Sequence, residues 1–128
     1  MDDLSLGVPE PVLERLPEDG DDAAIDMQQA VAGWEARLNQ AIDDAEDDSE
    51  AAGYVLDAIE RFEERRDTYD DLVPELRAWG QSPIYAIAWR TLYADVIAQL
   101  YDHDDLSTHL DRERNARVVE DGIRLRDL

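Results

Sequence analysis

Apolar residues recur at intervals of three and four over two consecutive stretches of the chain, and this spacing restricts the fold more than any other feature. In the first stretch the repeated positions are Ala24, Met27, Val31, Trp34, Leu38, Ala41 and Ala45. In the second they are Ala52, Val55, Ile59, Phe62, Arg66, Tyr69, Val73 and Leu76. Positions spaced in this way share one face of an α-helix, so we predict two long helices with apolar seams. Only a short polar break, residues 46–48, separates them, so they are expected to run antiparallel.

A third helix is predicted over residues 83–101, the longest stretch that is dense in large apolar side chains. Ser82 suits the N-cap of a helix, and Pro83 suits the first helical position, where its missing N–H costs nothing. On a helical wheel one broad apolar arc contains Tyr85, Trp89, Leu92, Tyr93, Val96, Ile97 and Leu100. A helix with so wide an arc contacts neighbours on two sides, so we expect it to lie at the centre of the fold.

The fold class predicted from these patterns is all-α, an antiparallel bundle of four helices at about 22–45, 49–73, 83–101 and 105–120. Pro74 removes a backbone donor, so the second helix is expected to end or kink there, with a short turn over 74–79. Residues 117–126 allow two interpretations. A helix is favoured, but Asp121-Gly122 is also a signal for a two-residue β-hairpin turn.

Residues 1–20 are predicted to form a flexible or loosely packed N-terminal arm on a single domain of residues 21–128. Three prolines and two glycines interrupt this arm too often for a long element. Its start has no basic segment followed by a long apolar run, so no signal peptide is expected. The charged residues Arg90 and Asp95 also argue against a membrane span in the third helix.

The charge of the chain is strongly negative, at −21, from 33 acidic residues against 12 basic ones. Every basic residue is arginine, and aspartate outnumbers glutamate. Such a chain repels itself unless salt screens the charges. The composition resembles that of halophilic archaeal proteins, so we expect a salt-adapted protein of the cytoplasm. With no cysteine, disulfides and thiolate metal sites are excluded.

Motifs of familiar enzyme classes are missing from the sequence. It contains no Gly-x-Ser-x-Gly nucleophile elbow, no phosphate-binding glycine loop and no Glu-x-x-His pair of the di-iron bundles. We therefore expect a non-catalytic protein without a cofactor, one that acts through homo-oligomerisation or a protein partner. The apolar seams of the first two helices make a two-fold homodimer plausible, with those helices at the interface.

Two alternative functions rest on the C-terminal third. Asp105, His109 and Glu113 share one helix face and, with His103, are weak candidates for a divalent metal site. In a chain with 33 acidic residues, some will lie beside a histidine by chance, so an ordinary solvated helix face is the favoured interpretation.

The second alternative is a winged-helix-like DNA-binding regulator. Residues 112–128 carry a net charge of +1, against −22 for residues 1–111. Candidate contacts to nucleic acid or a partner are Arg112, Arg114, Arg117, Arg124 and Arg126. The wing would require a hairpin at 117–126, and the net charge disfavours DNA. Arginines that bridge to the acidic bundle, in the same chain or a partner's, are the favoured interpretation.

Two arginines occupy positions where the helical pattern predicts apolar residues. Arg66 and Arg90 are candidate buried charges, and a buried guanidinium needs a carboxylate such as Asp57 or Asp95, or an anionic ligand. Several aromatic residues could line a ligand pocket, although their helical spacing favours core packing. They are Trp34, Trp79, Tyr85, Trp89 and Tyr93.

Overall fold

The structure, a computed structural model, describes the backbone of residues 3–127 and the side chains of residues 3–103 and 106–121. This part of the chain forms five α-helices and contains no strand. They are α1 (Glu10–Glu14), α2 (Asp21–Asp44), α3 (Asp48–Ala78), α4 (Ile84–Tyr101) and α5 (Asp104–Asp127). The all-α prediction is therefore confirmed.

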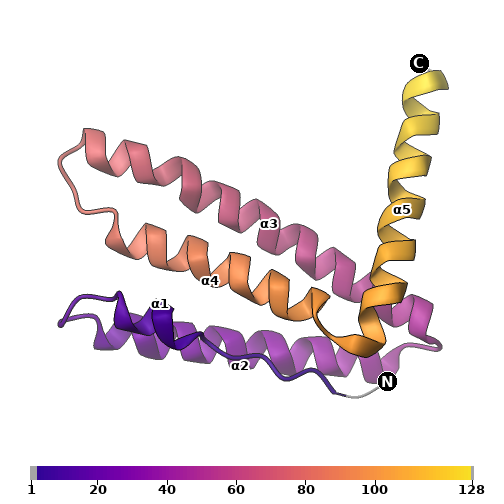
Figure 1. Cartoon of the computed structure of the whole chain (residues 1–128), viewed down its shortest axis with the longest axis horizontal. Coiled ribbons are helices and arrows are strands. Elements are labelled where there is room, and N and C mark those ends of the chain that lie inside the picture. Colours follow the sequence, from indigo (N-terminus) through magenta and orange to yellow (C-terminus); the bar gives the residue numbers. More distant parts are fainter. Residues whose placement is uncertain (1–2, 128) are drawn as a thin grey trace.

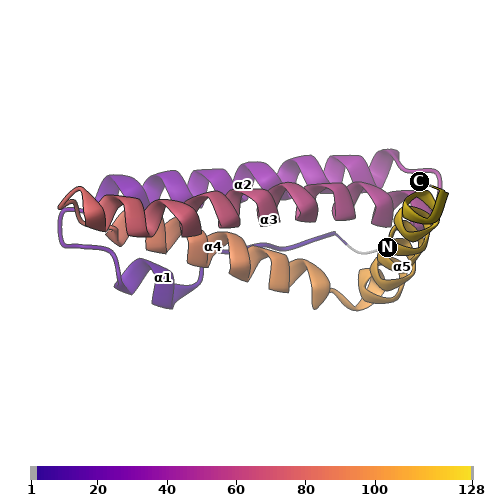
Figure 2. The ribbon, with the colours of Figure 1, turned by 90° about the horizontal axis from the view of Figure 1, so that it is seen from above.

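Three long helices, α2, α3 and α4, lie along the long axis of the molecule (Figures 1 and 2). The predicted seams form their common core, which includes Met27 and Val31 of α2 and Val55 and Ile59 of α3, each at most 2% exposed. On α4, Leu92, Val96 and Leu100 are fully buried. These residues are buried within the chain, and the homodimer interface that the sequence suggested on the first two helices stays a prediction.

Helix α3 begins and ends with well-formed caps. The Asp47 side chain accepts a hydrogen bond from the Glu50 backbone N–H at 2.8 Å, which caps the first turn. At the other end Gly80 has a φ of 73°, and the Gln81 N–H donates to the Leu76 carbonyl at 2.8 Å. This is the Schellman arrangement, which satisfies carbonyls of the last turn.

The expected break of this helix at residue 73 is wrong, because the α-helix continues through Pro74 to Ala78. Proline disrupts a helix by removing one hydrogen bond and crowding the carbonyl four residues earlier. In this chain Pro74 lies close to the end of a 31-residue helix, so the disruption is confined to its last turns. Burial of Val73, at 6% exposure, holds the same turn against the body of the protein.

The N-terminal arm packs along α2 and α4 rather than standing away from them (Figure 2). The Asn39 side chain bonds both the N–H and the carbonyl of Leu4, at 2.7 and 3.0 Å. Gln99 does the same for Gly7, at 3.1 and 2.9 Å. Leu4 and Val12 are buried, at 4% and 3% exposure. The segment that the sequence suggested to be flexible or loosely packed therefore contributes two apolar side chains to the protein interior.

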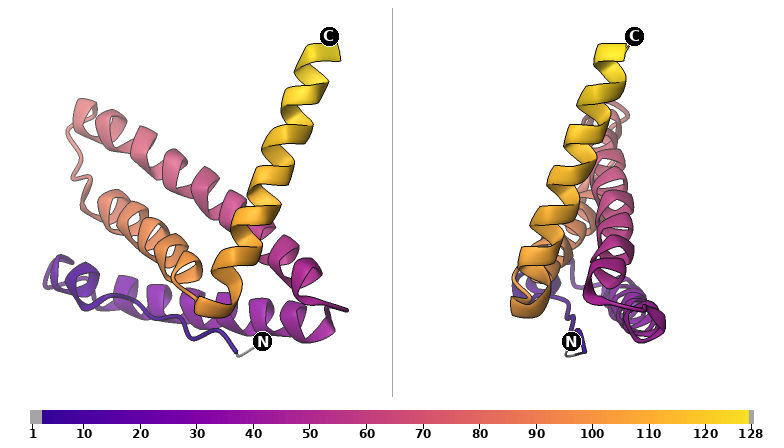
Figure 3. Two further views of the ribbon diagram at one scale, coloured as in Figure 1. Left: turned by 45° about the vertical axis from the view of Figure 1, so that its right-hand side comes forward. Right: turned by 90° about the vertical axis from the view of Figure 1, so that its right-hand side faces the viewer.

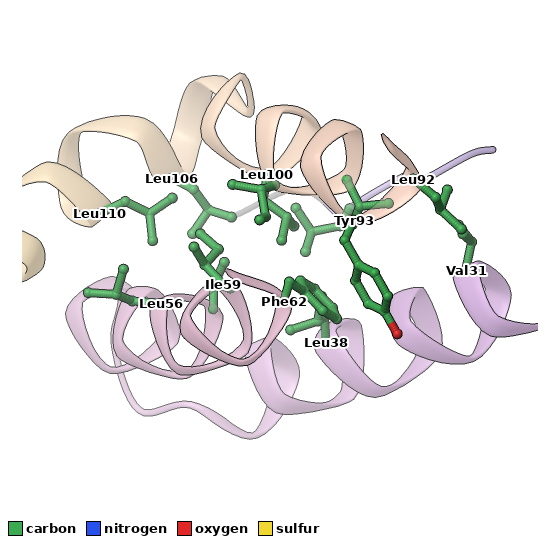
Figure 4. Packing of buried hydrophobic residues seen from close by; sticks show 14 of the residues in the cluster. Val31, Leu38, Leu56, Ile59, Phe62, Leu92, Tyr93, Leu100, Leu106 and Leu110 are labelled. Carbon is green, nitrogen blue, oxygen red and sulfur yellow. The ribbon is translucent and has the colours of Figure 1, made fainter. Parts of the chain in front are cut away.

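Helix α5 crosses one end of the three-helix layer and then projects from it (Figures 1 and 3). Leu106 and Leu110 are fully buried, and Figure 4 shows them facing Leu56 and Ile59 of α3. Beyond Leu110 the apolar spacing weakens, so only the first two turns of α5 are drawn into the core. This explains why α5 does not complete the predicted antiparallel bundle of four helices.

Residues 117–126 are helical throughout, within α5. The alternative of a β-hairpin is therefore wrong, and the wing of the DNA-binding hypothesis is missing. Asp121-Gly122 favours a hairpin only where two flanking strands can pair, and here the preceding turns of α5 continue the helix.

Candidate functional site

Arg66 and Arg90, the candidate buried charges, are only partly buried. Their side chains are 35% and 34% exposed. Arg66 pairs with Asp67 at 3.3 Å, and Arg90 of α4 reaches Asp70 of α3 at 2.8 Å. No described residue is both charged and buried. Both arginines therefore lie at helix edges beside carboxylates other than the Asp57 and Asp95 suggested by the sequence.

Arg117 joins α5 to α3 through several acidic side chains. It contacts Asp57 and Glu60 of α3 at 2.9 Å each, and Glu113 of its own helix at 3.5 Å. Burial alone would lower the pKa of Arg117, but its hydrogen bonds to Glu60 and Asp57, with their negative charge, raise it. This arginine bridges to the acidic helices of the same chain, as the sequence analysis favoured.

The other C-terminal arginines have different environments. Arg114 donates to the Tyr101 hydroxyl, and its guanidinium lies 5.8 Å from the Tyr101 ring centroid. Arg112 is exposed on the same helix. The side chains of Arg124 and Arg126 lie outside the described residues.

The candidate metal ligands are not brought together in the described part of the chain. His109 lies 3.8 Å from Asp48 on α3, whereas Glu113 is paired with Arg117. His103 is half-buried, and its Nδ1 has no hydrogen-bond partner among the described residues. No three described His, Asp or Glu side chains form a group able to hold a metal ion. The Asp105 side chain lies outside the described residues.

An open groove lies between α2 and α3, with α4 beneath it, and has a volume of about 580 Å³. Aromatic rings form its floor: Trp34 of α2, Phe62 and Tyr69 of α3, and Trp89 and Tyr93 of α4. The Trp34 ring centroid lies 4.9 Å from that of Phe62 and 5.2 Å from that of Tyr93. Figure 4 shows Phe62 and Tyr93 side by side, with the Tyr93 hydroxyl pointing away from α4. We call this feature the α2–α3 groove.

Arginines line the rim of the α2–α3 groove, although the chain is so acidic. Arg37 comes from α2, and Arg61 and Arg65 lie one turn apart on α3. Asp57 is the one acidic residue of the lining, and Arg117 already neutralises it at 2.9 Å. None of the three rim arginines forms an ion pair with a described carboxylate. Arg37 donates only to the Gly33 carbonyl, at 3.3 Å.

The electrostatics of the floor reflect both burial and the nearby arginine. Burial raises the pKa of Tyr93, the neighbouring Tyr69 adds to the rise, and the positive charge of Arg65 opposes it. Tyr93 is therefore a neutral hydroxyl at neutral pH, able to donate a hydrogen bond. Tyrosine, tryptophan and arginine side chains suit this groove for binding rather than for nucleophilic chemistry.

Sequence reasoning identified only part of this groove. Trp34, Trp89 and Tyr93 line it, whereas Trp79 and Tyr85 are exposed elsewhere, at 68% and 42%. The sequence pattern singles out Arg66, which interrupts the apolar seam, and does not single out the rim arginines. A usable signal was present, since Arg61 and Arg65 are four residues apart and flank the seam residue Phe62.

None of the helices in the described part of the chain has the length and apolarity needed to cross a membrane. The chain matches neither a curated protein nor a solved structure. One family model matches residues 1–127, which is nearly the whole chain. The chain therefore belongs to the family of unknown function (DUF7971).

Proposed function

We propose that this chain is a non-catalytic, salt-adapted protein of the cytoplasm that acts by self-association. The surface proposed to pair is the α5 extension, residues 118–127, which follows Arg117, the residue that pairs with Asp57 and Glu60 of α3. The proposed occupant of this surface is a second copy of the chain.

The exposure of two adjacent apolar residues is the observation that carries the proposal. Val118 and Val119 are 64% and 61% exposed, on α5, whose C-terminal part projects from the other helices (Figure 3). Ala116, Val119 and Ile123 also keep the spacing of three and four that buries residues elsewhere in the chain. A free helix end is marginally stable in water, so an apolar face on it favours a partner.

Charge complementarity favours a second copy as that partner. Residues 112–128 have a net charge of +1, whereas residues 1–111 have −22. Arginines of this C-terminal segment can pair with carboxylates on the acidic helices of another copy, although the extension itself, with two arginines and three acidic residues, has a net charge of −1. The contact of Arg117 with Asp57 and Glu60 is an example of such pairing within one chain.

Salt adaptation is proposed from composition. A chain without lysine, with many aspartates and a charge of −21, suits a medium in which ions screen the repulsion. Apolar contact strengthens rather than weakens at high salt, so a pairing surface built on valines remains effective there.

Light scattering in about 2 M KCl tests self-association, because salt at this level screens the charges within about 3 Å. We expect twice the mass of the 14.6 kDa chain. The double variant Val118→Ser/Val119→Ser is expected to be monomeric, with an unchanged circular dichroism spectrum. Ile25→Ser is the matched control, since Ile25 is 49% exposed on α2 and should leave the dimer intact.

Two results would contradict this proposal. A monomeric wild-type chain would rule out self-association and leave a different protein as the partner. A dimer that persists in the double variant would place the interface on another surface.

A further inference from the structure

We infer that the α2–α3 groove is a binding site for a small anion that carries a flat aromatic body, such as an aryl phosphate or an aryl carboxylate. This inference is independent of the α5 extension, which contributes no residue to the groove lining.

The size of the groove suits a small molecule. Its volume of about 580 Å³ lies within the range of roughly 300–1,000 Å³ that is typical of small-molecule pockets. It is open to solvent along α2 and α3, so a ligand enters without displacing a helix. The floor offers aromatic surface to a flat ring, because Tyr69 and Trp89 line the groove, are only partly buried, and have planes at an angle of 15° to each other.

The rim determines the charge of the ligand. Arg37, Arg61 and Arg65 form no ion pair with a described carboxylate. Asp57, the single acidic residue of the lining, is already paired with Arg117. In a chain with 33 acidic residues, three arginines free of carboxylates around one groove form a local positive site. Guanidinium groups bind phosphate or carboxylate through two parallel hydrogen bonds.

The floor and the rim together select the class of ligand. An inorganic anion would leave the aromatic floor uncovered, and a neutral aromatic molecule would leave the arginines unused. The Tyr93 hydroxyl, which has no hydrogen-bond partner among the described residues, adds a neutral donor beside Arg65.

Nuclear magnetic resonance of the full chain in about 0.5 M KCl tests the inference, since long-range charge effects are then largely screened. The probe is 1-naphthyl phosphate, compared with 1-naphthoate, 1-naphthol and inorganic phosphate. The three tryptophan indole N–H signals serve as reporters. Those of Trp34 and Trp89, in the groove, are expected to shift on binding. That of Trp79, which is 68% exposed and outside the lining, should stay unchanged.

We expect an aryl anion to bind at least about tenfold more tightly than 1-naphthol or inorganic phosphate, a difference of about 1.4 kcal/mol. Comparison of the phosphate and carboxylate probes then identifies the preferred headgroup. The double variant Arg61→Gln/Arg65→Gln should weaken binding about tenfold or more. The control Arg66→Gln/Arg77→Gln removes the same charge from the same helix outside the groove lining and should bind normally.

Three results would overturn the inference. They are equal affinity for 1-naphthol, equal loss of binding in the groove and control variants, and no shift of the Trp34 and Trp89 signals. Light scattering of the Arg61→Gln/Arg65→Gln variant provides a separate check. If it changed the mass of the protein, the groove would be an interface between copies rather than a ligand site. Ligand binding at the groove is measured independently of self-association. If the proposed dimer through Val118 and Val119 did not form, the binding experiment would still test the groove.

Discussion

Arginine side chains in this protein differ in role according to the face of the helix on which they lie. A shift of one position along the sequence is enough to change that face. Arg66 and Arg90 lie at helix edges and pair with nearby aspartates. Arg61 and Arg65, on the same helix as Arg66, face the aromatic floor instead. The sequence predicted that Arg66 was unusual because it broke a pattern. It could not predict the roles of the other two, because the groove exists only once α4 brings its aromatic residues beneath α2 and α3.

Replacement of two glycines by alanine is expected to change the stability of the fold in opposite directions. One of them, Gly53, lies inside α3, and the other, Gly80, lies just after its C-terminal end. Gly80 has a φ of 73°, so Gly80→Ala should destabilise the fold by about 1–2 kcal/mol. Gly53 lies inside α3, and a Cβ added there meets nothing within 4 Å. Gly53→Ala should therefore stabilise the fold by about 0.5–1 kcal/mol. Urea unfolding in KCl measures both changes, and two shifts of the same sign would contradict this account.

At the scale of elements, the sequence predicted the helices whose apolar spacing is regular and missed features that depend on tertiary contact. The repeats in α2 and α3 and the apolar density of α4 identified three helices. Pro74 suggested a helix end, but local packing of Val73 outweighed that preference. The direction of α5 could not be predicted, because it follows from tertiary contacts: the burial of Leu106 and Leu110 and the ion pairs of Arg117 with α3.

The attachment of α5 to α3 depends on Arg117, whose side chain is 29% exposed. Arg117→Met should reduce the free energy of unfolding by about 1–2 kcal/mol, allowing for solvent screening of these pairs. It should also speed hydrogen exchange of the amides in residues 111–121, while those of α4 remain protected. Arg112→Met is the matched control, since Arg112 is exposed on the same helix. Equal effects of the two substitutions would show that the contact with Asp57 and Glu60 contributes little.

At the scale of the whole molecule, the net charge of −21 opposes the compact state. The free energy of unfolding should rise steeply between about 0.1 and 1 M KCl, and then flatten as the screening length falls to about 3 Å. A variant with five fewer negative charges tests the cause. It carries Asp26→Asn, Asp43→Asn, Glu64→Gln, Asp71→Asn and Asp111→Asn, all at exposed positions. Urea unfolding should show a smaller rise with KCl for this variant, and equal rises would point away from charge repulsion.

The N-terminal arm has a consequence for the order in which the protein folds. Gly7 is held by Gln99, so two hydrogen bonds join residues that are 92 positions apart. Closing so large a loop costs chain entropy that only later contacts repay. During synthesis the arm emerges before the helices, and its partner on α4 is made only after α2 and α3 are complete. The arm is thus made before the helices on which it packs, yet it is among the last segments to reach its final place.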